Sequence, residues 1–286
     1  MPELPEVQTI AADLDELIGG STIEAATVSF PKIVAGDVDH FLHLVSGAEI
    51  TKVERLGKWI RFSLAGPLGP AAMLAHLKMT GQFRLGSWPR DHLWPPHVHA
   101  AFRLAGRPPE TDTLFYHDIR KFGRLRAFEP AELADFLLHL NQGPDPLTVN
   151  PSEFHQRLTA RKGRLKSVLL DQTIVAGLGN IYVDEGLFAA GLSPMRSAAE
   201  LTLAETSRLL VETRRILQAS IEARGSTTSN YQGLKGGGSF QSLHQVYGQT
   251  GRACPRCGAP VEHCIVGGRS THYCPHCQPK SPVVSA

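Results

Sequence analysis

Met1-Pro2-Glu3-Leu4-Pro5-Glu6 opens a chain of 286 residues and begins the helix around which the first part of the fold is predicted to assemble. Apolar residues recur at helical spacing after it and two glycines follow Ile18, so residues 5–18 are predicted to form an amphipathic helix. The helix tethers the chain terminus to a packed element, as a positioned reactive group requires.

The terminus itself can carry chemistry. Removal of Met1 would leave Pro2 as a secondary amine, and α-amino groups titrate near ~7.7–8, so part of it would be unprotonated at neutral pH. Such an amine can form a Schiff base, and Glu3 and Glu6 are suited to transfer protons beside it. The same residues also fit an ordinary helix start, with proline and acid in the first turn.

Length and composition limit the class of protein. The chain is long enough for two domains, contains no apolar run of membrane-spanning length and has no signal-peptide pattern, so a cytoplasmic protein is expected. The net charge is only +2, but five basic residues and no acid occupy residues 157–166, which suggests a local polyanion-binding face or a solvated helix face.

Residues 22–128 are rich in short strand-like runs separated by turns, which is typical of a sandwich or barrel. The predicted strands are 23–30, 49–55, 58–64, 71–77, 98–104, 113–117 and 125–128. Three loop positions carry polar or aromatic groups: Lys58 after Gly57, the run His76-Leu77-Lys78-Met79-Thr80-Gly81, and the run Arg120-Lys121-Phe122-Gly123. An aromatic beside cations on a turn suits a wedge into a base stack, although a turn residue beside solvated charges also explains it.

The chain changes to helical patterns after Pro130. Helices are predicted at 131–140, at 153–158 with Ser152 as the cap, at 164–170, and from the Thr202–Glu205 capping box to about residue 224. Gly177-Leu178-Gly179-Asn180 is a turn that enters another helix. The two glycines and the helix start suit phosphate binding, with Asn180 as a cap or a phosphate ligand. Residues 225–242 are rich in Gly, Ser and Thr and are predicted to form a flexible linker or a lid.

Two Cys-x-x-Cys pairs, Cys254/Cys257 and Cys274/Cys277, have the spacing of a four-cysteine zinc site. Four thiolates close the coordination sphere, so one structural zinc ion is predicted, with a hairpin that turns at Gly267-Gly268 and carries Arg269. The fifth cysteine, Cys264, is predicted to be a small buried residue and not a ligand.

In this order, the motifs at Pro2–Val7, His76–Gly81, Arg120–Gly123, Gly177–Tyr182 and Cys254–Cys277 resemble those of the formamidopyrimidine-DNA glycosylase family. The resemblance implies an α+β protein with an N-terminal β-sandwich behind a leading helix, a helix-two-turn-helix domain and a C-terminal zinc-finger hairpin. The domains expected on this basis are 2–130, 131–225, a flexible lid or linker at 226–243, and the zinc finger at 244–280.

The resemblance also implies a function and roles. A monomer would remove oxidised purines from double-stranded DNA and then cleave the abasic site. The Pro2 amine would attack the sugar, Glu3 would act as acid and base, and Glu6 would organise the terminus. Phosphates would be bound by Lys58, Asn180, Arg269 and His76, and the space of the extruded base would be filled by Met79, Arg120 and Phe122, with Lys121 also contacting DNA.

Two features depart from the family pattern. Lys235-Gly236-Gly237-Gly238-Ser239-Phe240 lacks the proline common in the family's lid, and Lys121 replaces a common arginine. Two alternatives therefore stay open. One is an endonuclease VIII-like enzyme for oxidised pyrimidines, which Leu4 disfavours because those relatives usually have glycine there. The other is a non-catalytic zinc-dependent DNA-binding relative, which the intact Pro2/Glu3 pair disfavours.

Overall fold

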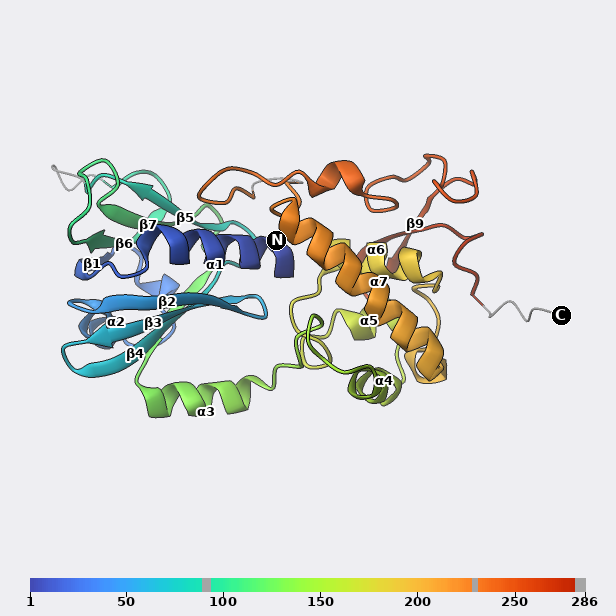
Figure 1. The fold of residues 1–286 in the computed structure, drawn as a ribbon, viewed down its shortest axis with the longest axis horizontal. Coiled ribbons are helices and arrows are strands. Elements are labelled where there is room, and N and C mark those ends of the chain that lie inside the picture. Colours follow the sequence, from blue (N-terminus) through green and yellow to red (C-terminus); the bar gives the residue numbers. More distant parts are fainter. Residues whose placement is uncertain (89–93, 228–230, 281–286) are drawn as a thin grey trace. The chain divides into compact units, whose positions relative to one another are not determined.

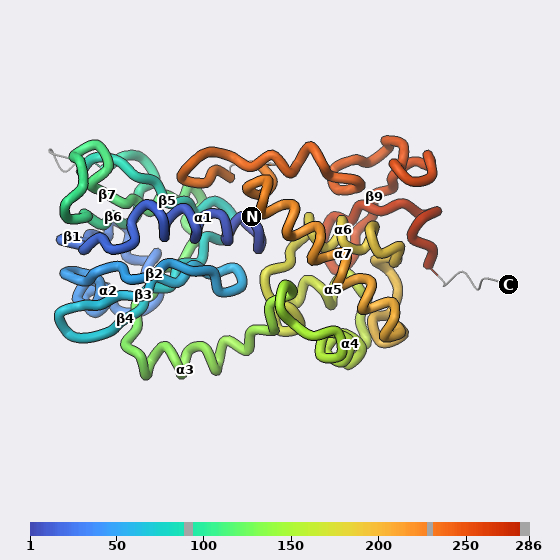
Figure 2. The backbone as a smooth tube through the Cα atoms, viewed as in Figure 1, coloured from blue at the N-terminus to red at the C-terminus, as the bar shows by residue number. Residues whose placement is uncertain are grey.

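A computed structural model describes residues 1–88, 94–227 and 231–280. The chain divides into two compact units, and the first is discontinuous in sequence: it joins Met1–Leu140 to Arg224–Gly238, whereas Asn141–Ala223 and Ser239–Ala286 form the second. Figure 1 shows the helices and strands of each unit, and Figure 2 follows the backbone through them. Among the described residues, no helix combines the length and the apolar character needed to cross a membrane.

The first unit is built from two antiparallel four-stranded sheets, which confirms the β-sandwich. One sheet has the order β1-β6-β7-β5 and the other β2-β3-β4-β8. The strands are β1 Ile23–Val28, β2 Glu49–Leu56, β3 Trp59–Gly66, β4 Gly69–His76, β5 Gly81–Gly86, β6 Val98–Leu104, β7 Thr113–Asp118 and β8 Arg124–Phe128. Helices α1 (Leu4–Ile18), α2 (Val38–Val45) and α3 (Pro130–Leu140) accompany them.

Helix α1 packs its apolar stripe into a core that both sheets share (Figure 1). Ile10 and Leu14 are buried together with Phe62 of β3 and Phe102 of β6. Complete burial of each such side chain contributes roughly 1.5–3 kcal/mol, so the helix is held by its stripe and not by propensity alone. The leading helix is therefore fixed along its length, and its first turn is a rigid platform.

The pairing of the strands fixes which loops of the first unit lie next to each other. Across the second sheet Trp59 pairs with His76 and His76 with Arg124, so the β2–β3 turn that holds Lys58 lies beside the end of β4. In the first sheet Gly81 pairs with Asp118, which places the β4–β5 loop next to the end of β7. Most of the predicted site residues of this unit lie at or next to these two sets of paired strand ends.

The second unit is helical and ends in a hairpin. It contains α4 Pro151–Thr159, α5 Leu165–Leu169, α6 Asn180–Ala190, α7 Leu203–Glu222, β9 Glu262–Val266 and β10 Arg269–Tyr273, with short 3-10 turns at Ala198–Glu200 and Phe240–Leu243. Nearly every residue of α6 is buried, which makes it the central helix. The Thr202–Glu205 capping box is confirmed, and the positive φ angles of Gly267 and Gly268 fit the predicted tight turn between β9 and β10.

Several sequence-based predictions need correction. Asn150, not Ser152, caps α4, because its side chain accepts the amide of Glu153 at 2.8 Å. Helix α2 and strand β5 were not predicted, although Asp37 caps α2 by accepting the amide of His40. The segment Ser87–Pro96, whose tryptophans and prolines predict a longer loop, lies partly outside the described residues.

Candidate active site and DNA-binding residues

The head of α1 holds a buried carboxylate in a fixed position. Pro2, Glu3 and Glu6 are all buried, the two carboxylates to 3% and 2% exposure. One oxygen of Glu6 accepts the amide of Glu3 at 2.8 Å, and the other accepts the amide of Ser226 at 2.8 Å. Glu6 thereby fixes the backbone of Glu3 next to Pro2.

Ser226 belongs to a segment that sequence reasoning did not connect to α1. Arg224 donates to Asp13 of α1 at 2.6 Å, and the amide of Lys235 donates to the same carboxylate at 3.3 Å. Tyr231 joins the core of this unit. The described residues of 224–238 therefore pack on α1, although their composition predicts flexibility. A high content of glycine and serine indicates that the unfolded backbone is flexible. It does not reveal which contacts the folded chain makes.

Gly225 also lies against Glu6 in this segment. Its φ is +86°, in the left-handed region that favours glycine, and a Cβ there would lie 2.8 Å from Oε1 of Glu6. No larger residue fits without moving the carboxylate. Glycine is thus required at this position for two independent reasons.

Lys58 and His76 lie together at the end of the second sheet. Lys58 is 8% exposed and occupies the turn just before β3. His76 packs edge-on against Trp59, with ring centroids 4.8 Å apart, and its Nδ1 accepts the amide of Lys78 at 3.0 Å. Burial, followed by the charges of Lys78 and Lys58, lowers the pKa of His76 to about 3. His76 is therefore neutral at physiological pH and can bind a phosphate only as a hydrogen-bond donor.

The candidate wedge residues are exposed on two neighbouring loops. Met79 is 41% exposed and Phe122 is 49% exposed, both unusual for apolar side chains. The guanidinium of Arg120 lies over the Phe122 ring, 4.8 Å from its centroid, which is cation–π geometry. Lys121 instead directs its ammonium over the Phe30 ring at 4.8 Å. Arg120 and Phe122 thus form one exposed pair on the loop next to that of Met79, and Lys121 is directed to Phe30 instead.

In the second unit, the glycine turn presents Asn180 at the start of α6. Gln172 holds the turn by accepting the amide of Gly177 at 2.9 Å and donating to the carbonyl of Leu178 at 2.9 Å. Gly179, not Asn180, is the N-cap residue, so the Asn180 side chain is not used in capping. Within the described chain, Oδ1 of Asn180 is buried and has no hydrogen-bond partner. This oxygen is a hydrogen-bond acceptor, so it can bind a donor group of a ligand, whereas a phosphate would need the amide nitrogen of the same side chain.

A buried ion pair connects α5, α6 and the hairpin that carries Arg269. Lys166 donates to Asp184 at 2.6 Å and to the carbonyl of Ser270 at 2.6 Å, and both ionic side chains are completely buried. Asp184 also accepts the amide of His272 at 2.9 Å. Ser270 and His272 belong to β10, which Arg269 begins. The pair therefore fixes the strand next to the exposed Arg269 guanidinium.

The four predicted zinc ligands are brought together. The Sγ atoms of Cys254, Cys257, Cys274 and Cys277 all lie within 4.8 Å of one another. Two of the separations are 3.8 Å and 3.5 Å, close to the ~3.8 Å between sulfur atoms of a tetrahedral site with Zn–S bonds of ~2.3 Å. Cys264 lies outside the cluster on β9, where burial raises the pKa of its thiol. The cysteines form a site for one structural zinc ion.

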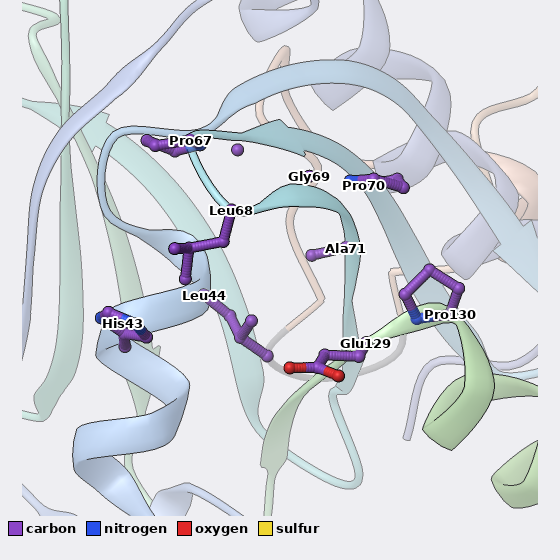
Figure 3. Close-up of a pocket in the computed structure, with 10 residues that line it drawn as sticks. His43, Leu44, Pro67, Leu68, Gly69, Pro70, Ala71, Glu129 and Pro130 are labelled. Atoms are coloured by element: carbon purple, nitrogen blue, oxygen red, sulfur yellow. The ribbon is translucent and has the colours of Figure 1, made fainter.

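Two cavities in the described residues lie apart from these groups. Figure 3 shows one of about 180 Å³ in the first unit, where Glu129 and Pro130 face Leu44 of α2 and the Pro67–Pro70 turn. None of the predicted site residues lines it. A larger cavity of about 350 Å³ in the second unit lies between α6, α7 and the Phe240–Leu243 turn and also contains none of them. The predicted residues instead lie at a helix head, on loops and on the hairpin.

Comparisons with known proteins cover the whole chain. Residues 1–125 match the formamidopyrimidine-DNA glycosylase N-terminal domain, 142–232 the formamidopyrimidine-DNA glycosylase H2TH domain, and 251–280 the zinc finger found in FPG and IleRS. A formamidopyrimidine-DNA glycosylase from Streptococcus pyogenes serotype M3 is 41% identical over 99% of this chain and 100% of its own.

Solved structures agree. A Lactococcus lactis FPG mutant in complex with DNA containing Fapy-dG has a TM-score of 0.88 and 34% identity, and covers 98% of this chain and 100% of its own. A MutM structure in complex with DNA containing carbocyclic 8-oxo-G has a TM-score of 0.87 and 33% identity, with the same coverage.

A β-sandwich behind a leading helix, a helix-two-turn-helix unit and a four-cysteine zinc hairpin define a class of zinc-containing DNA-repair glycosylases. The matches are full-length on both sides. The chain belongs to the formamidopyrimidine-DNA glycosylase family, whose members are DNA glycosylases and AP lyases.

Proposed function

We propose that this enzyme excises oxidised purines, 8-oxoguanine and formamidopyrimidines, from double-stranded DNA through a Schiff base on Pro2, and then cleaves the abasic strand. The observation that carries the proposal is the head of α1, where the Glu6 carboxylate holds the Glu3 backbone beside Pro2. Supporting it, solved relatives of this chain are described in complex with DNA containing Fapy-dG and carbocyclic 8-oxo-G.

The chemistry follows from one nucleophile. After loss of Met1, the Pro2 nitrogen attacks C1′ of the damaged nucleotide, the N-glycosidic bond breaks, and the base leaves with a proton. Glu3 receives and returns protons as the ring oxygen opens and an iminium forms at C1′. The iminium acidifies the C2′ protons, so elimination expels the 3′ phosphate and a second elimination expels the 5′ phosphate. Water then hydrolyses the iminium between Pro2 and the sugar fragment, which releases the Pro2 amine.

The remaining residues hold the substrate. Lys58 and His76 in the first unit, and Asn180 and Arg269 in the second, are proposed to bind phosphates around the extruded nucleotide. Met79, Arg120 and Phe122 fill the vacated space, because a duplex with an empty position would close again. Zinc supplies no reacting group; it fixes the hairpin of β9 and β10, with which Arg269 is positioned. A monomer acting on chromosomal DNA accounts for these roles.

Borohydride trapping on abasic DNA tests the proposal. The wild-type enzyme should form a covalent adduct at the residue identified as Pro2 by peptide mass spectrometry, and Pro2→Gly should lose excision while still binding DNA. Glu3→Gln should bind and lose excision. Absence of an adduct with wild type would leave the non-catalytic DNA-binding alternative.

Lesion preference needs a separate measurement, since the lid segment departs from the family pattern at residues 235–240. Single-turnover excision from matched duplexes with 8-oxoguanine or thymine glycol should favour the purine. A clear preference for thymine glycol would support the endonuclease VIII-like alternative. DNA affinity should fall steeply with salt, as expected when phosphate contacts dominate.

A further inference from the structure

The two loops that carry the candidate wedge residues meet at one buried carboxylate. Asp118 ends β7 and is completely buried. Its Oδ1 accepts the hydroxyl of Thr80, the neighbour of Met79, at 2.5 Å, and its Oδ2 accepts the amide of Gly123 at 2.7 Å. The amide of Arg120 donates to both Thr80 Oγ1 at 3.1 Å and Asp118 Oδ1 at 3.2 Å. Thr80 is thus bonded to the opposite loop in two ways.

The carbonyl groups of the second loop are held from the other side. The guanidinium of Arg124 donates to the carbonyl of Gly123 at 2.7 Å, and lies 3.3 Å and 3.4 Å from those of Phe122 and Lys121. An anion therefore accepts the amides of this loop, and a cation donates to its carbonyls. Charge-assisted hydrogen bonds of this kind are stronger than neutral ones, so the loop is fixed before DNA arrives.

The Tyr116 hydroxyl limits the movement of both loops by steric contact. A Cβ on Gly123 would lie 1.7 Å from this hydroxyl, and one on Gly81 would lie 2.5 Å from it, so both loops end against the same group. Tyr116 is completely buried, and its hydroxyl has no hydrogen-bond partner within the described residues. Neither loop has space to shift toward Tyr116 without displacing it.

We propose that the Thr80–Asp118 hydrogen bond couples the two loops, so that Met79 enters the base stack together with Arg120 and Phe122 as one preformed wedge. The inference rests on the proposed function, since it concerns opening of the DNA duplex. Thr80 and Asp118 are positioning residues, because they act through the wedge and touch no reacting atom. If the two loops moved independently, each would have to be ordered when the base is extruded. The entropy cost would slow base extrusion and leave the chemical step unaltered.

Thr80→Val tests the coupling, because valine keeps the shape and removes only the hydroxyl. Single-turnover excision of 8-oxoguanine from a fully paired duplex should slow about tenfold, as expected for loss of a hydrogen bond to a charged group. Borohydride trapping on a single-stranded abasic oligonucleotide, which requires no opening of a stack, should stay within about twofold of wild type. Thr80→Ser restores the hydroxyl and should restore the duplex rate.

Two controls separate coupling from general damage. Thr113→Val makes the same substitution at a second buried threonine, at the start of β7, whose hydroxyl donates to Asp112 at 2.7 Å, and should leave both rates unchanged. In a Phe122→Ala background, Thr80→Val should add little to the duplex defect, because the wedge it positions is already lost.

Each outcome is decisive. Equal loss on duplex and single-stranded DNA, full additivity with Phe122→Ala, or an unchanged duplex rate would overturn the coupling while the enzymatic function stands. Failure of wild type itself to trap or excise would instead overturn the proposed function.

Discussion

Lowering the pH should destabilise the first unit through His76. Burial and the charges of Lys78 and Lys58 lower the pKa of His76 from 6.5 to about 3. Between those values the unfolded chain binds a proton that the folded chain excludes, so stability rises with pH across this window and falls as the pH drops below 6.5. At ~1.36 kcal/mol per unit, moving from pH 8 to pH 5 costs about 2 kcal/mol at this residue alone.

Tryptophan fluorescence can be used to follow the unfolding of the first unit. Trp59, Trp88 and Trp94 are the three tryptophans of the chain and all fall in the first unit, so intrinsic fluorescence during urea unfolding reports on that unit. His76→Asn keeps an acceptor for the Lys78 amide and removes the titrating ring.

The loss of unfolding free energy between pH 8 and pH 5 should be about 2 kcal/mol smaller for His76→Asn than for wild type. Other titrating groups contribute equally to both proteins and cancel in the difference. An identical pH dependence in the two proteins would refute the argument that His76 is held neutral in the fold.

Other perturbations follow from single contacts. Lys166→Met leaves the buried Asp184 carboxylate without its cation, and urea unfolding followed by circular dichroism should show a loss of about 3–5 kcal/mol. Gly225→Ala combines strain at a φ of +86° with a Cβ 2.8 Å from Glu6, so it should lower stability by about 1–3 kcal/mol and slow borohydride trapping. Cys254→Ser should release zinc to a colorimetric chelator more readily and weaken DNA binding measured by fluorescence anisotropy.

Each of these three substitutions has a matched control substitution. Lys52→Met breaks an exposed pair with Asp15 of the same 2.6 Å length and should cost much less stability than Lys166→Met; an equal cost would contradict the importance of burial. Gly236→Ala has a φ of +113° with open space around it, so it should strain the backbone without slowing trapping. Cys264→Ser should retain zinc, and loss of zinc there would argue against the four-cysteine assignment.

Sequence patterns predicted the features that depend on local spacing. The amphipathic stripe of α1, the Thr202–Glu205 capping box and the paired cysteines each lie within a few residues of one another, so period and spacing suffice. Strand β5 contains a similar signal, with Phe83 and Leu85 alternating between two glycines, but the run is short and next to a motif that reads as a turn.

Contacts between distant segments left no local signal. Glu6 and Ser226 are 220 residues apart, and nothing in either neighbourhood identifies the other. The bond between Thr80 and Asp118 depends on the register of β5 on β7, which places Gly81 opposite Asp118. The low pKa of His76 likewise depends on burial beside Trp59, which requires the sheet to be assembled. These contacts follow from tertiary packing and strand register.

The discontinuity of the first unit has a consequence for biosynthesis. Glu6 leaves the ribosome before its partner Ser226, which follows 220 residues later. At about 5–20 residues per second, that interval is roughly 10–45 s. Throughout it, the nascent sandwich lacks Tyr231 in its core and the amide that fixes the Glu6 carboxylate. The head of α1 is therefore synthesised well before the segment that fixes its Glu6 carboxylate.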